Sequence, residues 1–294
     1  MIFKTVILVY SSICDKKMNE IENNVEKIPK FIRYALAAYS KRGYVGGIIS
    51  GEFAKGKTVT AIKIAGKILQ IKYRLTEEEA LNKVIDEYMI FTSDDFIEKT
   101  EQLYNEYDWE NMSPKEVLDT KYMIRLPVLI WDDAGIHASS KKERFDPGDS
   151  WELQTEYDTI RDITSCMLLT VPEEGELMRF LRSYRSNYFI ELATPSNVSN
   201  HYDRILYFYR YERDNKTGNM KRRLKWATKK PHSIHLDNYF YGKYDKNRTL
   251  AKIRHNEKLK RRKEEREIIK QYKLLKKQQL IARWSKEIKE LQTS

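Results

Sequence analysis

The chain has 294 residues, of which 41% are hydrophobic and 33% are charged. That length and apolar content suffice to bury a core, which disfavours a wholly disordered chain. The mean hydropathy is −0.69, and no apolar run approaches the roughly 20 residues of a membrane-spanning helix, which disfavours an integral membrane protein. Two cysteines, Cys14 and Cys166, are too few for a disulfide framework or a cysteine-based zinc site, so we expect a reducing, cytoplasmic location.

The net charge of +11 is unevenly distributed along the chain. Residues 1–200 carry −6, residues 201–247 carry +7 and residues 248–294 carry +10. An acidic body followed by a basic C-terminal third indicates a polyanionic partner for that third, most simply DNA. The alternative is a charged helix that is simply solvated.

The first 14 residues, MIFKTVILVYSSIC, are apolar apart from one lysine. A signal peptide would require a small-residue cleavage site, but Asp15, Lys16 and Lys17 follow instead. We therefore expect a buried strand or a docking segment at this end.

Residues 51–58, GEFAKGKT, match the phosphate-binding pattern GxxxxGK[ST]. The glycines permit a tight turn whose N–H groups face phosphate oxygens, and the lysine reaches the β- and γ-phosphates. A short apolar run precedes this loop, and residues 59–73 have apolar positions at helical spacing, so a helix N-terminus would face the phosphates. The residues expected to contact ATP are Gly51, Glu52, Phe53, Ala54, Lys55, Gly56, Lys57, Thr58 and Val59.

A second motif, LPVLIWDDAGIH at 126–137, is an apolar strand that ends in two acidic residues. It follows the phosphate loop by about 70 residues and has the form of a Walker B strand buried between neighbours. We expect Thr58 and Asp132 to hold Mg²⁺, and Asp133 to polarise the attacking water.

Residues 86–103, DEYMIFTSDDFIEKTEQL, predict a strand over Tyr88 to Phe91, a Thr-Ser-Asp helix cap and a helix from Asp95. This segment and the Asp-Asp ending of the second motif resemble bacterial replication initiators and helicase loaders, the DnaA/DnaC clade of AAA+ ATPases. The resemblance covers roughly residues 40–195 and implies a homo-oligomer. No helical lid or helix-turn-helix domain is evident in the sequence, which favours a compact ATPase of the kind carried by archaeal viruses and plasmids.

The resemblance implies further site residues. The strand SCMLLTVPEE at 165–174 is similar to the sensor strand, and Thr170 would touch the γ-phosphate or the attacking water. The segment 177–192 is similar to the helix that precedes the last strand, where an arginine reaches the neighbouring subunit's ATP site. Arg182 and Arg185 are the candidates here, and Arg179 is a weaker one. A surface salt bridge is the alternative function of these arginines.

Two later segments predict DNA contacts. Residues 204–228 alternate apolar or aromatic with polar residues around a turn, which is typical of a β-hairpin with Tyr207, Tyr209 and Tyr211 on one face. Interleaved aromatic and basic side chains suit nucleic acid, although the hairpin could instead pack on the sheet. From about Arg248 a long helix is predicted, ending in an apolar stripe that suits a protein partner. The residues expected to contact DNA are Arg222, Arg223, Lys225, Lys258, Lys260, Arg261, Arg262 and Lys263.

The polar segment 138–160 predicts a solvent loop or a loop whose Lys141, Lys142 and Arg144 face a central pore. The predicted organisation is an N-terminal segment (1–40), a P-loop ATPase core (41–200), a basic aromatic hairpin (201–247) and a basic C-terminal helix (248–294). The fold class is α/β, with a parallel P-loop NTPase sheet of the ASCE/AAA+ type flanked by helices.

Three functions fit these motifs. The first is an ATPase that acts on DNA in replication initiation, helicase loading or remodelling. The second is a DNA-packaging or translocation ATPase of the FtsK/HerA or Zot-like class, which usually shows Asp-Glu at Walker B and Gln or Asn on the sensor strand. The third is a nucleotide-gated adaptor without catalysis, for which the Asp-Asp pair is an argument.

Overall fold

The structure of the chain is a computed structural model that describes residues 29–52, 54–139, 147–183, 187–195, 200–213 and 220–293. The chain divides into two compact units, Met1–Tyr244 and Asp245–Ser294. The first unit contains the sheet and the candidate site. The apolar segment at residues 1–14, for which a strand or docking segment is predicted, lies outside the described residues.

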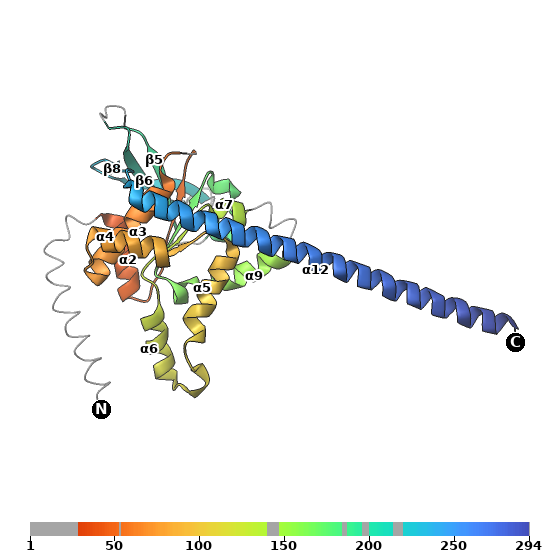
Figure 1. Cartoon of the computed structure of the whole chain (residues 1–294). Coiled ribbons are helices and arrows are strands. Elements are labelled where there is room, and N and C mark those ends of the chain that lie inside the picture. The colour runs from red at the N-terminus through yellow and green to blue at the C-terminus, as the bar shows by residue number, and fades with distance from the viewer. Residues whose placement is uncertain are drawn as a thin grey trace. The chain divides into compact units, whose positions relative to one another are not determined.

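The described residues of the first unit form one eight-stranded sheet with helices on both faces (Figure 1). The strand order is β2-β3-β4-β1-β5-β6-β7, and β8 pairs with β6. Strands β2, β3, β4, β1 and β5 are parallel, whereas β6, β7 and β8 join in antiparallel pairs. The bounds are β1 Val45–Ser50, β2 Met89–Ile90, β3 Leu129–Trp131, β4 Cys166–Val171, β5 Asn187–Ala193, β6 Asp203–Arg213, β7 Met220–Ala227 and β8 His232–Ser233.

Two groups of helices cover the two faces of the parallel strands. One face packs against α2 and α3, with α4 behind α3, and the other packs against α5, α9, α10 and α11. Their bounds are α2 Lys30–Ser40, α3 Lys57–Tyr73, α4 Glu77–Glu87, α5 Ser93–Asn105, α9 Pro147–Asp158, α10 Ile160–Ile163 and α11 Arg179–Ser183. The remaining helices are α6 Pro114–Ile124, α7 Ala134–His137, α12 Asn238–Thr293 and the 3₁₀ turns Trp109–Asn111 and Glu174–Glu176. This arrangement confirms the predicted α/β fold with a flanked parallel sheet.

The core on the α5 face is built from apolar side chains that alternate along the buried strands. Ile48 of β1, Trp131 of β3 and Leu169 of β4 are almost completely buried there, and Phe96 of α5 stacks on Trp131 with ring centroids 5.6 Å apart. On the other face Gly47 leaves room for Phe31 of α2, because a Cβ at Gly47 would lie 3.1 Å from the Phe31 ring. Both faces of the parallel strands are therefore apolar, as continuous hydrophobic runs predict.

The strand–cap–helix order predicted for residues 86–103 is confirmed, although the strand is limited to Met89–Ile90 and helix α5 begins at Ser93, two residues before the expected Asp95. Strand β2 is followed by Thr92, whose side chain accepts a hydrogen bond from the Asp95 N–H at 3.0 Å, while the Asp95 carboxylate accepts one from the Thr92 N–H at 3.0 Å. This reciprocal cap satisfies two backbone donors at the start of α5. It fixes the direction in which the chain leaves the sheet toward the α5 face.

The predicted hairpin forms and extends the sheet. Strand β6 pairs with β5 on one side and with β7 on the other, where Phe208 and Trp226 oppose each other and stack 4.9 Å apart. The Phe208 ring also stacks on Phe31, which contacts Tyr188 of β5. The alternatives for the hairpin were a nucleic-acid contact and packing on the sheet, and the fold shows the hairpin joined to the sheet through β5. The turn at residues 214–219 lies outside the described residues.

The polar segment at 138–160 differs from the predicted loop. Residues 147–158 form helix α9, in which Leu153 and Tyr157 are buried in the core, and the Tyr157 hydroxyl lies 2.9 Å from that of Tyr44. These two residues lie one helical turn apart, but the residues around them are mostly polar, so the sequence did not predict a helix here. Lys141, Lys142 and Arg144 lie outside the described residues.

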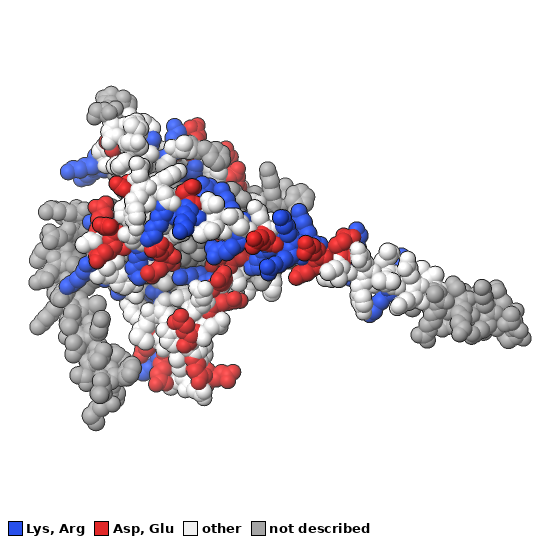
Figure 2. Space-filling model, in the orientation of Figure 1, with Lys and Arg blue, Asp and Glu red and all other residues white. Residues whose placement is uncertain are grey.

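The predicted C-terminal helix begins ten residues earlier than Arg248, at Asn238. Within the described part of the chain, no helix combines the length and the apolar character that a membrane span requires. Figure 2 shows acidic side chains prevailing around α5 and α6, in keeping with the negative charge of the first 200 residues. Along α12 the same view shows basic and acidic side chains interspersed.

Candidate nucleotide-binding site

The phosphate loop joins β1 directly to α3, which begins at Lys57. Gly51 donates its N–H to the Pro172 carbonyl at 3.0 Å, which ties the start of the loop to the end of β4. Gly56 has φ +84°, a left-handed conformation that glycine adopts without steric cost. The strand, glycine loop and helix N-terminus thus adopt the arrangement in which backbone N–H groups and the helix dipole favour an anion.

Gly56 also lies against the side chain of Ile234. A Cβ built on Gly56 would lie 2.6 Å from Ile234 Cδ1 and 2.7 Å from its Cβ. Gly56→Ala is therefore expected to destabilise the folded state by about 1–3 kcal/mol through backbone strain alone, and to weaken ATP binding. Thermal unfolding and nucleotide titration measure the two effects.

Two further variants separate the causes of that loss. Ile234→Ala in the Gly56→Ala background should recover only the steric part, because the positive φ remains. Gly242→Ala, in an open position of α12, should stabilise the chain by up to about 1 kcal/mol and leave nucleotide binding unchanged. Wild-type binding by Gly56→Ala would contradict the assigned function of the loop.

Lys57 is enclosed by the loop and is only 8% exposed. Its ammonium donates to the Gly51 carbonyl at 2.7 Å and to the Glu52 carbonyl at 2.9 Å. Burial lowers the pKa of Lys57, whereas the carboxylates of Asp133, Asp132 and Glu176 oppose that shift. The cation is therefore held inside the concave side of the loop with three acidic groups around it.

Asp132 is fully buried at the end of β3. Its Oδ1 accepts hydrogen bonds from Thr58 Oγ1 at 2.7 Å and from Thr170 Oγ1 at 2.7 Å. Its Oδ2 accepts one from the Tyr244 hydroxyl at 2.7 Å. Because β1, β3 and β4 are parallel, their carboxyl ends meet at one edge of the sheet, and this brings together Thr58 and Asp132, which are 74 positions apart.

Thr170 connects the two acidic residues. Its hydroxyl donates to Asp132 and accepts from the Asp133 N–H at 2.9 Å. Asp133 has φ +51°, a left-handed conformation that is uncommon outside glycine and that occurs often at functional sites. The contact of Thr170 with a phosphate or water remains a prediction, and in the structure its hydroxyl links Asp132 to the backbone of Asp133.

The oxygen donors at this edge fit magnesium. Thr58 Oγ1 and the Asp132 carboxylate lie 2.7 Å apart, and both are hard oxygen ligands of the kind that Mg²⁺ takes together with substrate phosphates. No cluster of three or more His, Cys, Asp or Glu side chains suited to a metal occurs among the described residues. That is compatible with Mg²⁺, which usually relies on one or two carboxylates, phosphates and water.

The other predicted loop residues lie around the same turn. Glu52 and Lys55 form an exposed ion pair of 3.4 Å, Ala54 has φ +61°, and Val59 lies in the first turn of α3. Phe53 lies outside the described residues.

The structure describes two of the three candidate arginines, Arg179 and Arg182. Arg182 lies in α11 and is half-buried, close enough to Tyr211 of the hairpin to oppose the rise in that tyrosine's pKa that burial causes. Arg179 lies on the same helix and is exposed, and Arg185 lies outside the described residues. The contact of Arg182 or Arg185 with a neighbouring subunit stays a prediction.

Two of the three predicted DNA-contacting residues of the hairpin, Arg222 and Lys225, form ion pairs within the chain. Arg222 lies 4.1 Å above the Tyr209 ring and forms ion pairs with Glu191 at 3.1 Å and Glu174 at 3.9 Å. Lys225 forms an ion pair with Glu212, and Arg223 is exposed on the same strand. The predicted basic residues of α12 belong to the second unit and are exposed or half-exposed, namely Lys258, Lys260, Arg261, Arg262 and Lys263.

The sequence alone did not reveal two side chains of this site, Tyr244 and Glu176. Tyr244 comes from an aromatic-rich segment, and no local sequence pattern predicts that this tyrosine contacts Asp132. Glu176 follows β4, and its position after the sensor strand was a usable signal, because that strand ends at the same edge as the phosphate loop. His232 lies on β8, and burial lowers its pKa to about 4.

No family model and no curated protein matches this chain. Among solved structures it is similar to the N-terminal domain of zonular occludens toxin from Neisseria meningitidis, with 14% identity and a TM-score of 0.30 over 68% of this chain and 97% of that one. A KaiC-like protein from Pyrococcus horikoshii OT3 matches with 14% identity and a TM-score of 0.26 over 62% and 87%. The flagellar accessory protein FlaH from Methanocaldococcus jannaschii matches with 14% identity and a TM-score of 0.28 over 62% and 91%. At such identities and scores, these likenesses assign neither an activity nor a partner to this chain.

Proposed function

We propose that this chain binds ATP with Mg²⁺ at the phosphate loop, hydrolyses it and acts on DNA. The observation that carries the nucleotide site is the convergence of the loop with β3, in which Thr58 Oγ1 donates to the buried Asp132 at 2.7 Å. A buried carboxylate next to a buried lysine and a helix N-terminus suits a phosphate–magnesium pair. A strand that merely ended in acidic residues would have no need of a buried lysine and a helix N-terminus beside its carboxylate.

Each residue then has a function in hydrolysis. Lys57 would bind the β- and γ-phosphates, and Thr58 with Asp132 would hold Mg²⁺. Bound Mg²⁺ would neutralise charge that develops on the phosphate oxygens. Asp133 would orient the attacking water, and Thr170 would keep Asp132 and Asp133 in place through its two hydrogen bonds.

The proposed assembly is a homo-oligomer in which Arg182 or Arg185 of one subunit reaches the ATP site of the next. This follows the resemblance to AAA+ initiators and helicase loaders. The proposed setting is replication initiation, helicase loading or DNA remodelling.

DNA is the proposed partner because of the basic C-terminal helix. Residues 248–294 hold 16 Lys and Arg against 6 Asp and Glu, and such a charge releases counterions when it binds a polyanion. The hairpin is the weaker candidate, since Glu191, Glu174 and Glu212 already pair with two of its cations. The C-terminal helix is therefore the proposed main DNA contact.

The test is ATP hydrolysis by the purified full chain, without DNA and with single- or double-stranded DNA, at low and moderate salt. We expect Mg²⁺-dependent turnover that DNA stimulates, and less stimulation at the higher salt. Tight ATP binding without turnover would replace this proposal by the nucleotide-gated adaptor. Absence of nucleotide binding would refute the site itself.

A further inference from the structure

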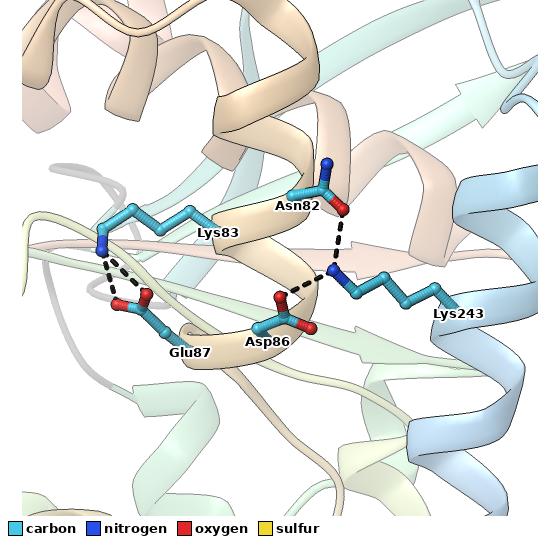
Figure 3. Close-up of polar contacts among 5 residues, drawn as sticks. All are labelled: Asn82, Lys83, Asp86, Glu87 and Lys243. Atoms are coloured by element: carbon cyan, nitrogen blue, oxygen red, sulfur yellow. Dashed lines mark hydrogen bonds and ion pairs between the residues drawn. The ribbon is translucent and has the colours of Figure 1, made fainter.

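The first turns of α12 are fixed to the P-loop core by two consecutive side chains. The ammonium of Lys243 donates to Asn82 Oδ1 at 2.7 Å and to Asp86 Oδ2 at 2.6 Å, both on α4 (Figure 3). Lys83 and Glu87 of the same helix pair with each other, 2.7 Å apart, away from Lys243 in Figure 3. Lys243 is thus held by one face of α4, and this sets the position of the next residue.

That next residue is Tyr244, whose side chain is 4% exposed. Its hydroxyl donates to Asp132 Oδ2 at 2.7 Å, on the oxygen opposite the one bound by the two threonines. Its ring lies beside Phe91 at the end of β2, with centroids 6.1 Å apart. Both its ring and its hydroxyl therefore have a defined place in the core.

Three hydroxyl groups from α3, β4 and α12 consequently hold one carboxylate. An ionised carboxylate has about four lone-pair directions, so three of them are occupied and one remains. A carboxylate fixed in this way can rotate little, and its remaining direction is set before any ligand arrives. Groups that orient a metal-binding carboxylate are commonly worth about 10–100-fold in metal affinity.

We propose that Tyr244 is a positioning residue that orients Asp132 for the magnesium–nucleotide complex. This inference rests on the proposed function, because it assigns Asp132 to Mg²⁺. It also gives the first turns of the C-terminal helix a direct part in the nucleotide site, through a single hydrogen bond. Tyr244 touches neither substrate nor metal in this assignment and acts through Asp132 alone.

The test is Tyr244→Phe, which removes the hydroxyl and keeps the ring that packs beside Phe91. A fluorescent ATP analogue is titrated into the full chain over a range of Mg²⁺ concentrations and again in excess EDTA. We expect the Mg²⁺ concentration needed for half-maximal nucleotide binding to rise about tenfold, with binding in EDTA unchanged. A merely structural function of Tyr244 would weaken both titrations alike and lower the melting temperature.

Tyr241→Phe is the matched control, since this tyrosine lies one turn earlier on α12 and is 52% exposed. It should behave as the wild type. In an Asp132→Asn background, Tyr244→Phe should add no further change in the Mg²⁺ requirement, because the oriented carboxylate is already lost.

The outcomes separate the two proposals. A wild type that binds the nucleotide with Mg²⁺, together with an unchanged requirement in Tyr244→Phe, would overturn the function of Tyr244 and leave the proposed site intact. A lower Mg²⁺ requirement in Tyr244→Phe would overturn it as well, because the hydroxyl would then compete with the metal. A wild type that binds no nucleotide would overturn the proposed function and this inference with it.

Discussion

Lys57→Ala is expected to lower Mg²⁺–ATP binding and hydrolysis by about 100-fold or more, since it removes a preorganised cation from the phosphate site. The ammonium is already held inside the loop by the Gly51 and Glu52 carbonyls, so little reorganisation is needed when phosphate binds. Its burial beside Asp132 and Asp133 also balances their negative charge. Binding is measured by titration of a fluorescent ATP analogue, and hydrolysis by phosphate release.

Lys55→Ala is the matched control for this variant. Lys55 lies in the same loop, and its expected contact with phosphate is through the backbone N–H, which alanine keeps. Its side chain is 41% exposed and pairs with the exposed Glu52. Exposed pairs of this kind contribute at most about 1 kcal/mol, so stability and hydrolysis should change little. Lys57→Met, which keeps most of the aliphatic chain, distinguishes loss of the charge from loss of packing. Turnover at the wild-type rate in both Lys57 variants would refute the ATPase assignment.

Much of the fold was predictable because its signals are local. The apolar runs that end in Asp132 and Thr170, and the Thr92 cap followed by Asp95, each lie within one short segment. Their positions in a parallel sheet then follow from the rule that parallel strands present their carboxyl ends at one edge. That rule accounts for the meeting of Thr58, Asp132 and Thr170 without any knowledge of side-chain geometry.

The parts that were missed depend on contacts between distant segments. Helix α9 has a weak apolar pattern, and only the burial of Leu153 and Tyr157 against the core shows why the segment is helical. Tyr244 contacts Asp132 across 112 residues of sequence, and the adjacent Lys243 binds Asp86 of α4 across 157 residues. Similarly, Arg222 alternates with aromatic residues as a DNA-binding strand would, yet two glutamates from other segments neutralise it.

These intramolecular ion pairs change which basic residues matter most for DNA. A cation that is already paired must lose its partner before it neutralises a phosphate, so it contributes less to counterion release. Arg222 and Lys225 are in that position. Residues 248–294 hold 16 Lys and Arg against 6 Asp and Glu, so ion pairs within that segment can neutralise only part of its positive charge. The salt dependence of DNA binding should therefore follow the C-terminal helix rather than the hairpin.

Neutralising the basic segment of α12 is expected to reduce both DNA affinity and its salt dependence. The variant replaces Lys258, Lys260, Arg261, Arg262 and Lys263 by glutamine, which retains good helix propensity while it removes five positive charges. If all five residues neutralise phosphates, the slope of log K against log salt should fall in magnitude by about 4.5 for duplex DNA. Fluorescence anisotropy of a labelled duplex at several salt concentrations measures this slope.

The matched control replaces Arg222, Arg223 and Lys225 of the hairpin by glutamine. Because Arg222 and Lys225 are paired with glutamates, we expect the slope to change by no more than about 1, the contribution of Arg223. Deletion of residues 248–294, which removes a net charge of +10, should reduce the slope at least as much as the five substitutions do. If the slope instead falls in the hairpin variant and not in the helix variant, the DNA contact lies on the extended sheet, and Arg222 must exchange its glutamate partners for phosphate when DNA binds.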